Sequence, residues 1–144
     1  MPRGSHGTVK RPRSIHRVIE ALRDDPLVIA RWYGDAEDRD VCESLVRALE
    51  DRDFVVREMA VRELVRLHDL YASRSILMTL AHGSTPARLA AVEVLAEIGR
   101  GDISTFQHLT IQLTGPDQVV RLAVCRALVR LADGLNDVAA ELAR

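Results

Sequence analysis

The sequence predicts an all-α protein folded as an α-solenoid (an α-α superhelix) of about three helix-turn-helix repeats with helical caps. Two observations predict this fold. Three segments align without gaps at separations of 31 and 33 residues, and their apolar residues recur at the three- and four-residue spacing of a helix. A single helix pair cannot bury its apolar face alone, so we expect the copies to stack around one continuous core.

The second helix of each repeat is predicted from the aligned segments 51–67, 82–98 and 115–131. One arginine and two apolar positions recur in all three copies: Arg57, Arg88 and Arg121; Leu64, Leu95 and Leu128; Leu67, Ile98 and Leu131. Side chains that can accept hydrogen bonds from a first helical turn precede them, namely Asp53, Ser84 and Asp117. Gly99 and Gly134 stand where the second and third of these helices are expected to end.

A first helix is predicted before each second helix, so the repeats span about 38–68, 69–99 and 102–133. Aspartates mark the expected starts: Asp38, Asp69 and Asp102. The apolar stripe comprises Val41, Leu45, Leu49, Ala72, Ile76, Leu80, Leu109 and Leu113. The stretch 109–114 alternates like a strand, but the repeat register favours a helix there, which we expect to be the least stable one.

The flanking residues predict helical caps at 14–33 and 136–144, within a single domain of residues 14–144. Two short helices are expected at 14–23 and 26–33, with Asp25-Pro26 as cap and first position and with Trp32 and Tyr33 covering the open end of the stack. The closing helix should turn Val138 and Leu142 inward. Residues 1–13 read as an expression-tag remnant followed by a basic, disordered and solvated arm.

Composition excludes several classes of protein. The 144 residues include 20 basic and 21 acidic ones, so no global field predicts a nucleic-acid or membrane partner. No apolar run approaches the roughly 20 residues of a membrane-spanning helix. Two cysteines, Cys42 and Cys125, are too few for a disulfide framework, and we expect both to be reduced and mostly buried. These features predict a cytoplasmic protein.

A known family carries the same repeat. The motif Asp51-x-Asp53-x-x-x-Arg57-x-x-Ala60-x-x-x-Leu64-x-x-Leu67 and its two copies resemble the HEAT repeats, particularly the short bacterial units of the phycobilisome-lyase type. The resemblance covers about residues 38–135 and implies an armadillo-type fold, with the second helices lining a concave face. It also implies contacts between stacked units from a turn aspartate and a helix arginine. Asp51 and Arg57 keep that pair, whereas His82 and Gly115 replace the acid.

No motif predicts catalysis or metal binding. The sequence contains no His-Glu-x-x-His, no Cys-x-x-Cys, no nucleophile elbow and no glycine-rich phosphate loop after a strand. The histidines at 68, 82 and 108 are expected at helix ends near water. We therefore predict a protein that is not an enzyme, with no catalytic residue, no cofactor and no metal site.

The surface stripe of the second helices carries charges whose sign alternates between repeats. These residues are Arg62 and Arg66, then Glu93 and Glu97, then Arg126 and Arg130. Side chains of neighbouring helices are close enough to pair, so the stripe predicts a ladder of ion pairs between units. A groove for phosphates should be basic throughout, and aromatic residues at 3% are too few for base stacking.

Apolar residues beside these charges suggest a partner-binding face. Val55, Leu89 and Leu122 fall near the stripe, where they are either packed between units or exposed as an apolar strip with a polar rim. The predicted function is a non-catalytic protein-interaction or scaffold module. Its partner is another protein or peptide, bound through Val55, Arg62, Arg66, Leu89, Glu93, Leu122, Arg126 and Arg130. The alternative is a nucleic-acid-binding helical-repeat protein that uses basic residues of the groove or of the basic arm, which includes Lys10, Arg11, Arg13 and Arg17.

Overall fold

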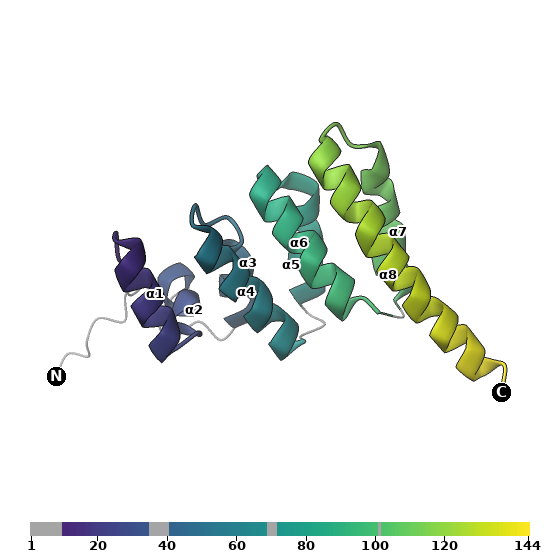
Figure 1. Ribbon diagram of the computed structural model, residues 1–144, viewed down its shortest axis with the longest axis horizontal. Coiled ribbons are helices and arrows are strands. Elements are labelled where there is room, and N and C mark those ends of the chain that lie inside the picture. The colour runs from purple at the N-terminus through teal and green to yellow at the C-terminus, as the bar shows by residue number, and fades with distance from the viewer. Residues whose placement is uncertain (1–9, 35–40, 69–71, 101) are drawn as a thin grey trace. The chain divides into compact units, whose positions relative to one another are not determined.

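The computed structural model describes residues 10–34, 41–68, 72–100 and 102–144 (Figure 1). They form eight α-helices and one 3-10 helix, and no strand occurs among them. The all-α class predicted from the sequence is therefore confirmed. The chain divides into two compact units, residues 1–75 (unit 1) and residues 76–144 (unit 2), and each is considered by itself.

Unit 1 holds four complete helices: α1 Ile15–Asp24, α2 Val28–Tyr33, α3 Val41–Ala48 and α4 Phe54–Leu67. Helix α3 packs against α2 and α4, and α1 contacts both α2 and α4. One apolar stripe from each helix forms the core, which contains Val18, Leu22, Ile29, Trp32, Leu45, Leu49, Val56, Ala60 and Leu64. Trp32 is thus part of the core of unit 1, and the predicted helix pair of the first repeat is present as α3 and α4.

Unit 2 holds most of α5 Ala72–His82, which begins in unit 1, together with α6 Thr85–Ile98, α7 Ile103–Ile111, η1 Gln112–Thr114 and α8 Gln118–Leu142. Helix α8 packs against α6, α7 and η1. Helix α6 is buried around most of its circumference, as expected for a central helix. Its buried residues are small or branched: Ala87, Ala90, Ala91, Val92, Val94, Leu95, Ala96 and Ile98.

Three of the predicted helix caps are confirmed. Ser84 Oγ accepts a hydrogen bond from Ala87 N at 3.3 Å, and Asp117 Oδ1 accepts one from Val119 N at 2.9 Å. Asp102 caps α7 through Ser104 N at 3.0 Å. Asp53 occupies the N-cap position of α4 but makes no capping hydrogen bond, so its predicted role is wrong. The predicted starts at Asp38 and Asp69 lie outside the described residues.

The predicted end at Gly134 is wrong, because α8 continues through it to Leu142. A glycine inside a helix costs only about 1 kcal/mol relative to alanine, and the residues that follow form helix readily. No separate closing helix exists at 136–144, and Leu142 is 83% exposed rather than turned inward. The side chain of Val138 lies outside the described part of the structure.

Gly99 ends α6 as predicted, and close packing explains the absence of a side chain there. A Cβ atom at this position would lie 2.6 Å from Leu95 O and 2.6 Å from Thr105 Cγ2. The glycine therefore lets the chain turn directly against α7. The predicted helix at 109–114 is confirmed as far as Ile111, and its last residues form the 3-10 turn η1.

Several smaller predictions need correction. Helix α2 begins at Val28 rather than at Pro26, because Asp25 Oδ1 accepts a hydrogen bond from Leu27 N at 3.0 Å and forms a turn before the helix. Val41, predicted for the buried stripe, is 37% exposed at the start of α3. Cys42 is buried as expected, whereas Cys125 is exposed on α8.

The capping contacts lead to a prediction about stability. Ser84→Ala should lower the free energy of unfolding by about 1 kcal/mol, because the first turn of α6 loses the acceptor for Ala87 N. Ser14→Ala is a matched control, since Ser14 occupies the N-cap of α1 without a side-chain capping bond. Urea denaturation followed by circular dichroism measures both values. Equal midpoints for the two variants would contradict the assigned cap.

Candidate functional site

A groove runs between α6 and α8 in unit 2 and brings together part of the predicted binding stripe. It has a volume of about 290 Å³ and is lined by Leu89, Val92, Glu93, Ala96, Ala123, Arg126, Ala127 and Arg130. The predicted site residues among these are Leu89, Glu93, Arg126 and Arg130. Small side chains on both helices let the backbones approach and leave a shallow apolar floor between the charged residues.

Polar contacts hold the two helices together at both ends of the groove. Near their N-termini, Thr85 Oγ1 donates a hydrogen bond to Asp117 Oδ2 at 2.7 Å. This bond holds the pKa of the Asp117 carboxyl below its usual value. Toward the other end, the Arg130 guanidinium forms an ion pair with the Glu97 carboxylate. The groove therefore has a defined width set by contacts at its two ends.

The ion pair between Glu97 and Arg130 confirms one rung of the predicted charge ladder. Arg126, one turn before Arg130, is exposed and forms no ion pair with a residue that the structure describes. It is a cation with a free guanidinium beside the apolar floor. Such a group can select a partner carrying an acidic residue while the floor accepts an apolar one.

The predicted site residues of the first repeat lie in unit 1, apart from this groove. Arg66 Nε donates to Glu63 Oε1 at 2.9 Å, within its own helix. Arg62 is exposed and Val55 is half-buried on α4. The ladder from the first to the second repeat stays a prediction.

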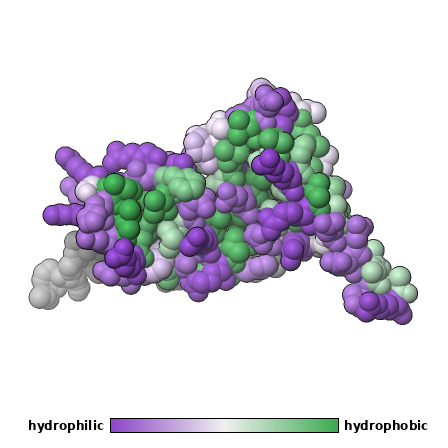
Figure 2. All heavy atoms as spheres, viewed as in Figure 1, coloured by the Kyte–Doolittle hydropathy of each residue, from purple (hydrophilic) through white to green (hydrophobic). Residues whose placement is uncertain are grey.

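The two open possibilities for Leu89 and Leu122 have different outcomes. Leu89 is half-buried and lines the groove, whereas Leu122 is 52% exposed and does not line it. The possibility that Leu122 is buried between repeats is therefore wrong. Figure 2 shows hydrophobic and hydrophilic side chains interspersed on the viewed face.

The recurring arginine has a structural role in each repeat. Arg57 Nη1 donates to the main-chain oxygens of Asp51 and Arg52, at 2.8 and 3.0 Å. Arg121 Nη1 donates to Gly115 O at 2.6 Å, and Arg88 Nε donates to Leu80 O at 3.0 Å. The arginines thus bind carbonyls at the turn between the two helices. Because these acceptors are backbone atoms, the turn does not need an acidic side chain.

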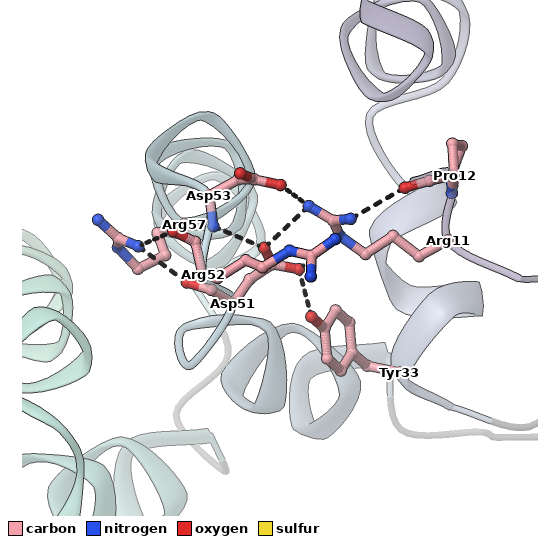
Figure 3. Close-up of polar contacts among 7 residues, drawn as sticks. All are labelled: Arg11, Pro12, Tyr33, Asp51, Arg52, Asp53 and Arg57. Carbon is pink, nitrogen blue, oxygen red and sulfur yellow. Dashed lines mark hydrogen bonds and ion pairs between the residues drawn. The ribbon is translucent and has the colours of Figure 1, made fainter. Parts of the chain in front are cut away.

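A second group of polar residues surrounds the Asp51 carboxylate in unit 1 (Figure 3). The Asp51 side chain is only 1% exposed. Its Oδ2 accepts a hydrogen bond from Arg11 Nε at 2.9 Å and another from the Tyr33 hydroxyl. Its Oδ1 accepts one from Asp53 N at 2.8 Å, and the Asp53 carboxylate pairs with Arg11. We call Arg11, Tyr33, Asp51 and Asp53 the Asp51 cluster.

The Asp51 cluster was missed by sequence reasoning. The expectation that the basic arm is solvated is wrong for Arg11, whose side chain is 16% exposed. Asp53 was expected to cap α4, but its carboxylate is used by Arg11. The sequence feature that could have indicated this cluster is the position of Asp51 in the repeat. A carboxylate buried there needs hydrogen-bond donors, and its own turn cannot supply all of them. A cavity of about 350 Å³ adjoins the cluster.

The Asp51 cluster has a structural role. Burial and the hydrogen bond to the Asp51 carboxylate raise the pKa of the Tyr33 hydroxyl above its usual value. Tyr33 therefore remains a neutral donor across the physiological range. The cluster connects the segment before α1, the end of α2 and the turn before α4. Its hydrogen-bond donors and acceptors bind one another.

No metal site or membrane span is present in the part of the chain that the structure describes. No three His, Cys, Asp or Glu side chains there are grouped so that they could hold a metal ion. None of the described helices is both long and apolar enough to cross a membrane.

Comparison with known proteins finds no matching family model, no curated protein with a significant match and no solved structure with a significant match. The resemblance to HEAT repeats accordingly rests on the repeated residues of the sequence.

The Asp51 cluster predicts a strong dependence of stability on Arg11. Arg11→Met should lower the free energy of unfolding by about 2 kcal/mol, because a buried carboxylate loses its cation but keeps two donors. The same change should cost much less beside Asp51→Asn, in which no buried charge remains. A double-mutant cycle in urea measures the difference. Equal costs in both backgrounds would show that Arg11 does not stabilise the Asp51 charge.

The raised pKa of Tyr33 predicts a late ionisation at alkaline pH. The protonated hydroxyl stabilises the fold fully below the ordinary tyrosine pKa of about 10, and that stabilisation is lost as the pH rises through the higher folded value. The ultraviolet absorbance of tyrosinate should therefore show one of the two tyrosines ionising only as the protein unfolds. Tyr33→Phe should remove that late step, and its persistence would contradict the assignment.

Proposed function

We propose that the chain is a HEAT-like α-solenoid of three helix pairs that acts as a non-catalytic protein-interaction module. The pairs would be α3 with α4, α5 with α6, and α7 with α8, stacked in the order that the repeat register predicts. Support comes from the recurring arginine, which closes the turn in each of the three pairs through backbone carbonyls. A repeat that preserves its turns but varies its surface is typical of binding scaffolds.

The observation that carries the proposal is the groove between α6 and α8. Four of the partner-binding residues predicted from the sequence, Leu89, Glu93, Arg126 and Arg130, line this one groove. Its small apolar floor and charged edges have the composition of a site for a peptide segment with one apolar anchor. The exposed Arg126 favours an acidic residue next to that anchor.

The same contacts disfavour nucleic acid as the partner. A phosphate-binding groove needs cations along its whole length, whereas this groove contains Glu93 and its Arg130 is paired with Glu97. Arg11 of the basic arm is held by Asp51 and Asp53. The basic groups that would have to bind phosphates are thus partly engaged with carboxylates.

Selection from a displayed random-peptide library tests the proposal. Peptides enriched on the wild-type protein should bind at least about tenfold more weakly to Ala123→Phe with Arg126→Glu, because the variant fills the floor and reverses the cation. Ala139→Phe with Arg100→Glu changes exposed residues outside the groove and serves as the matched control. Circular dichroism verifies that both variants fold.

The outcomes of the selection are distinct. Enriched peptides that carry an acidic residue beside an apolar one and lose affinity only for the groove variant would support the proposal. Peptides that bind the groove variant and the control equally would overturn it. Retention of the wild-type protein on DNA at physiological salt would favour the nucleic-acid alternative instead.

A further inference from the structure

Helix α8 has an apolar face that no described helix covers. Its buried side faces α6, α7 and η1 and consists of Val120, Val124, Ala127 and Leu131. The opposite side presents residues spaced three and four apart, and we call it the outer face of α8: Val119, Leu122, Arg126, Val129 and Asp133. Its three apolar members are 56%, 52% and 64% exposed. A row of exposed branched side chains along one helix marks a surface for association.

The charges on this outer face are arranged symmetrically. Arg126 and Asp133 lie on either side of Val129, and neither forms an ion pair with another described residue. They are seven residues apart, or about 10 Å along the helix, which is too far for them to pair with each other. A second helix running antiparallel, with the twofold axis midway between Val129 and Arg130, would place each Arg126 opposite the Asp133 of the other copy.

One further residue of the outer face, Val119, fits the same antiparallel arrangement. Val119 would lie opposite Ala140 of the second copy, a small residue that leaves room for it, whereas Leu122 would lie opposite Asp137. That region of α8 exists because the helix continues past Gly134 to Leu142. The extension of α8 thus supplies part of a self-complementary surface, with two reciprocal ion pairs and the contact of Val119 with Ala140.

We propose that the outer face of α8 binds a second copy of this chain as an antiparallel helix pair with twofold symmetry. Such an interface is isologous, because the same residues of both copies meet. A single pair of helices buries less area than most stable dimers, so the dissociation constant should be of the order of 100 µM. The proposal does not depend on peptide binding by the groove.

Charge exchange between the two positions tests this arrangement. Sedimentation of the wild-type protein from about 10 µM to about 1 mM should show a reversible monomer–dimer equilibrium. Arg126→Glu and Asp133→Arg should each weaken association by at least about tenfold, since each places like charges opposite one another. The double variant should regain the wild-type dissociation constant, because the pairs re-form with the signs exchanged. A reducing agent keeps the exposed Cys125 from forming a disulfide.

Two controls make the result decisive. Arg100→Glu changes the charge of an exposed residue off this face and should leave association unchanged. Val129→Glu should abolish association while far-UV circular dichroism stays at the wild-type value. A protein that remains monomeric at 1 mM, or single variants that the double exchange does not rescue, would overturn the proposal.

The test also separates this proposal from the proposed function. Arg126 lines the groove as well, so Arg126→Glu should weaken peptide binding. Asp133 does not line the groove, and Asp133→Arg should restore association of the double variant without restoring peptide binding. Loss of one activity with retention of the other would show which of the two proposals fails.

Discussion

The helix pairs of this protein depend on arginines that bind main-chain carbonyls at their turns. A turn between two packed helices leaves carbonyl groups without intrahelical partners, and a buried one is costly. Arg57 and Arg121 each donate to an oxygen six residues earlier in the chain. Arg88 reaches further back, to Leu80. The repeated position therefore conserves a contact with the backbone, and the side chains of the turn are free to vary.

This dependence explains which parts of the fold were predictable. Periodic apolar residues and the recurring arginine specify helix pairs directly, so most helices and the caps at Ser84, Asp102 and Asp117 agree with expectation. Local composition at Gly134 suggested an end, but one glycine does not outweigh the helix-forming residues around it. The length of α8 depends on the summed helix propensities of many residues. The presence of one glycine therefore does not predict where the helix ends.

The candidate site also has one part that the sequence predicts and one part that it does not. The register placed Leu89, Glu93, Arg126 and Arg130 along one surface of α6 and α8, because residues at equal repeat positions share a face, and all four line the groove. The Asp51 cluster joins segments up to 40 residues apart, and no periodicity encodes such a contact. Burial of one carboxylate is its physical cause, and burial depends on the tertiary packing of unit 1.

The position of Arg11 has a consequence for shortened forms of the chain. The first helix begins at Ile15, and a boundary drawn from helices alone would fall at Ser14. A chain shortened to that point would keep every helix of unit 1 but would enclose the Asp51 carboxylate without its counter-ion. The need for Arg11 in unit 1 is therefore a matter of electrostatic neutralisation rather than of secondary structure.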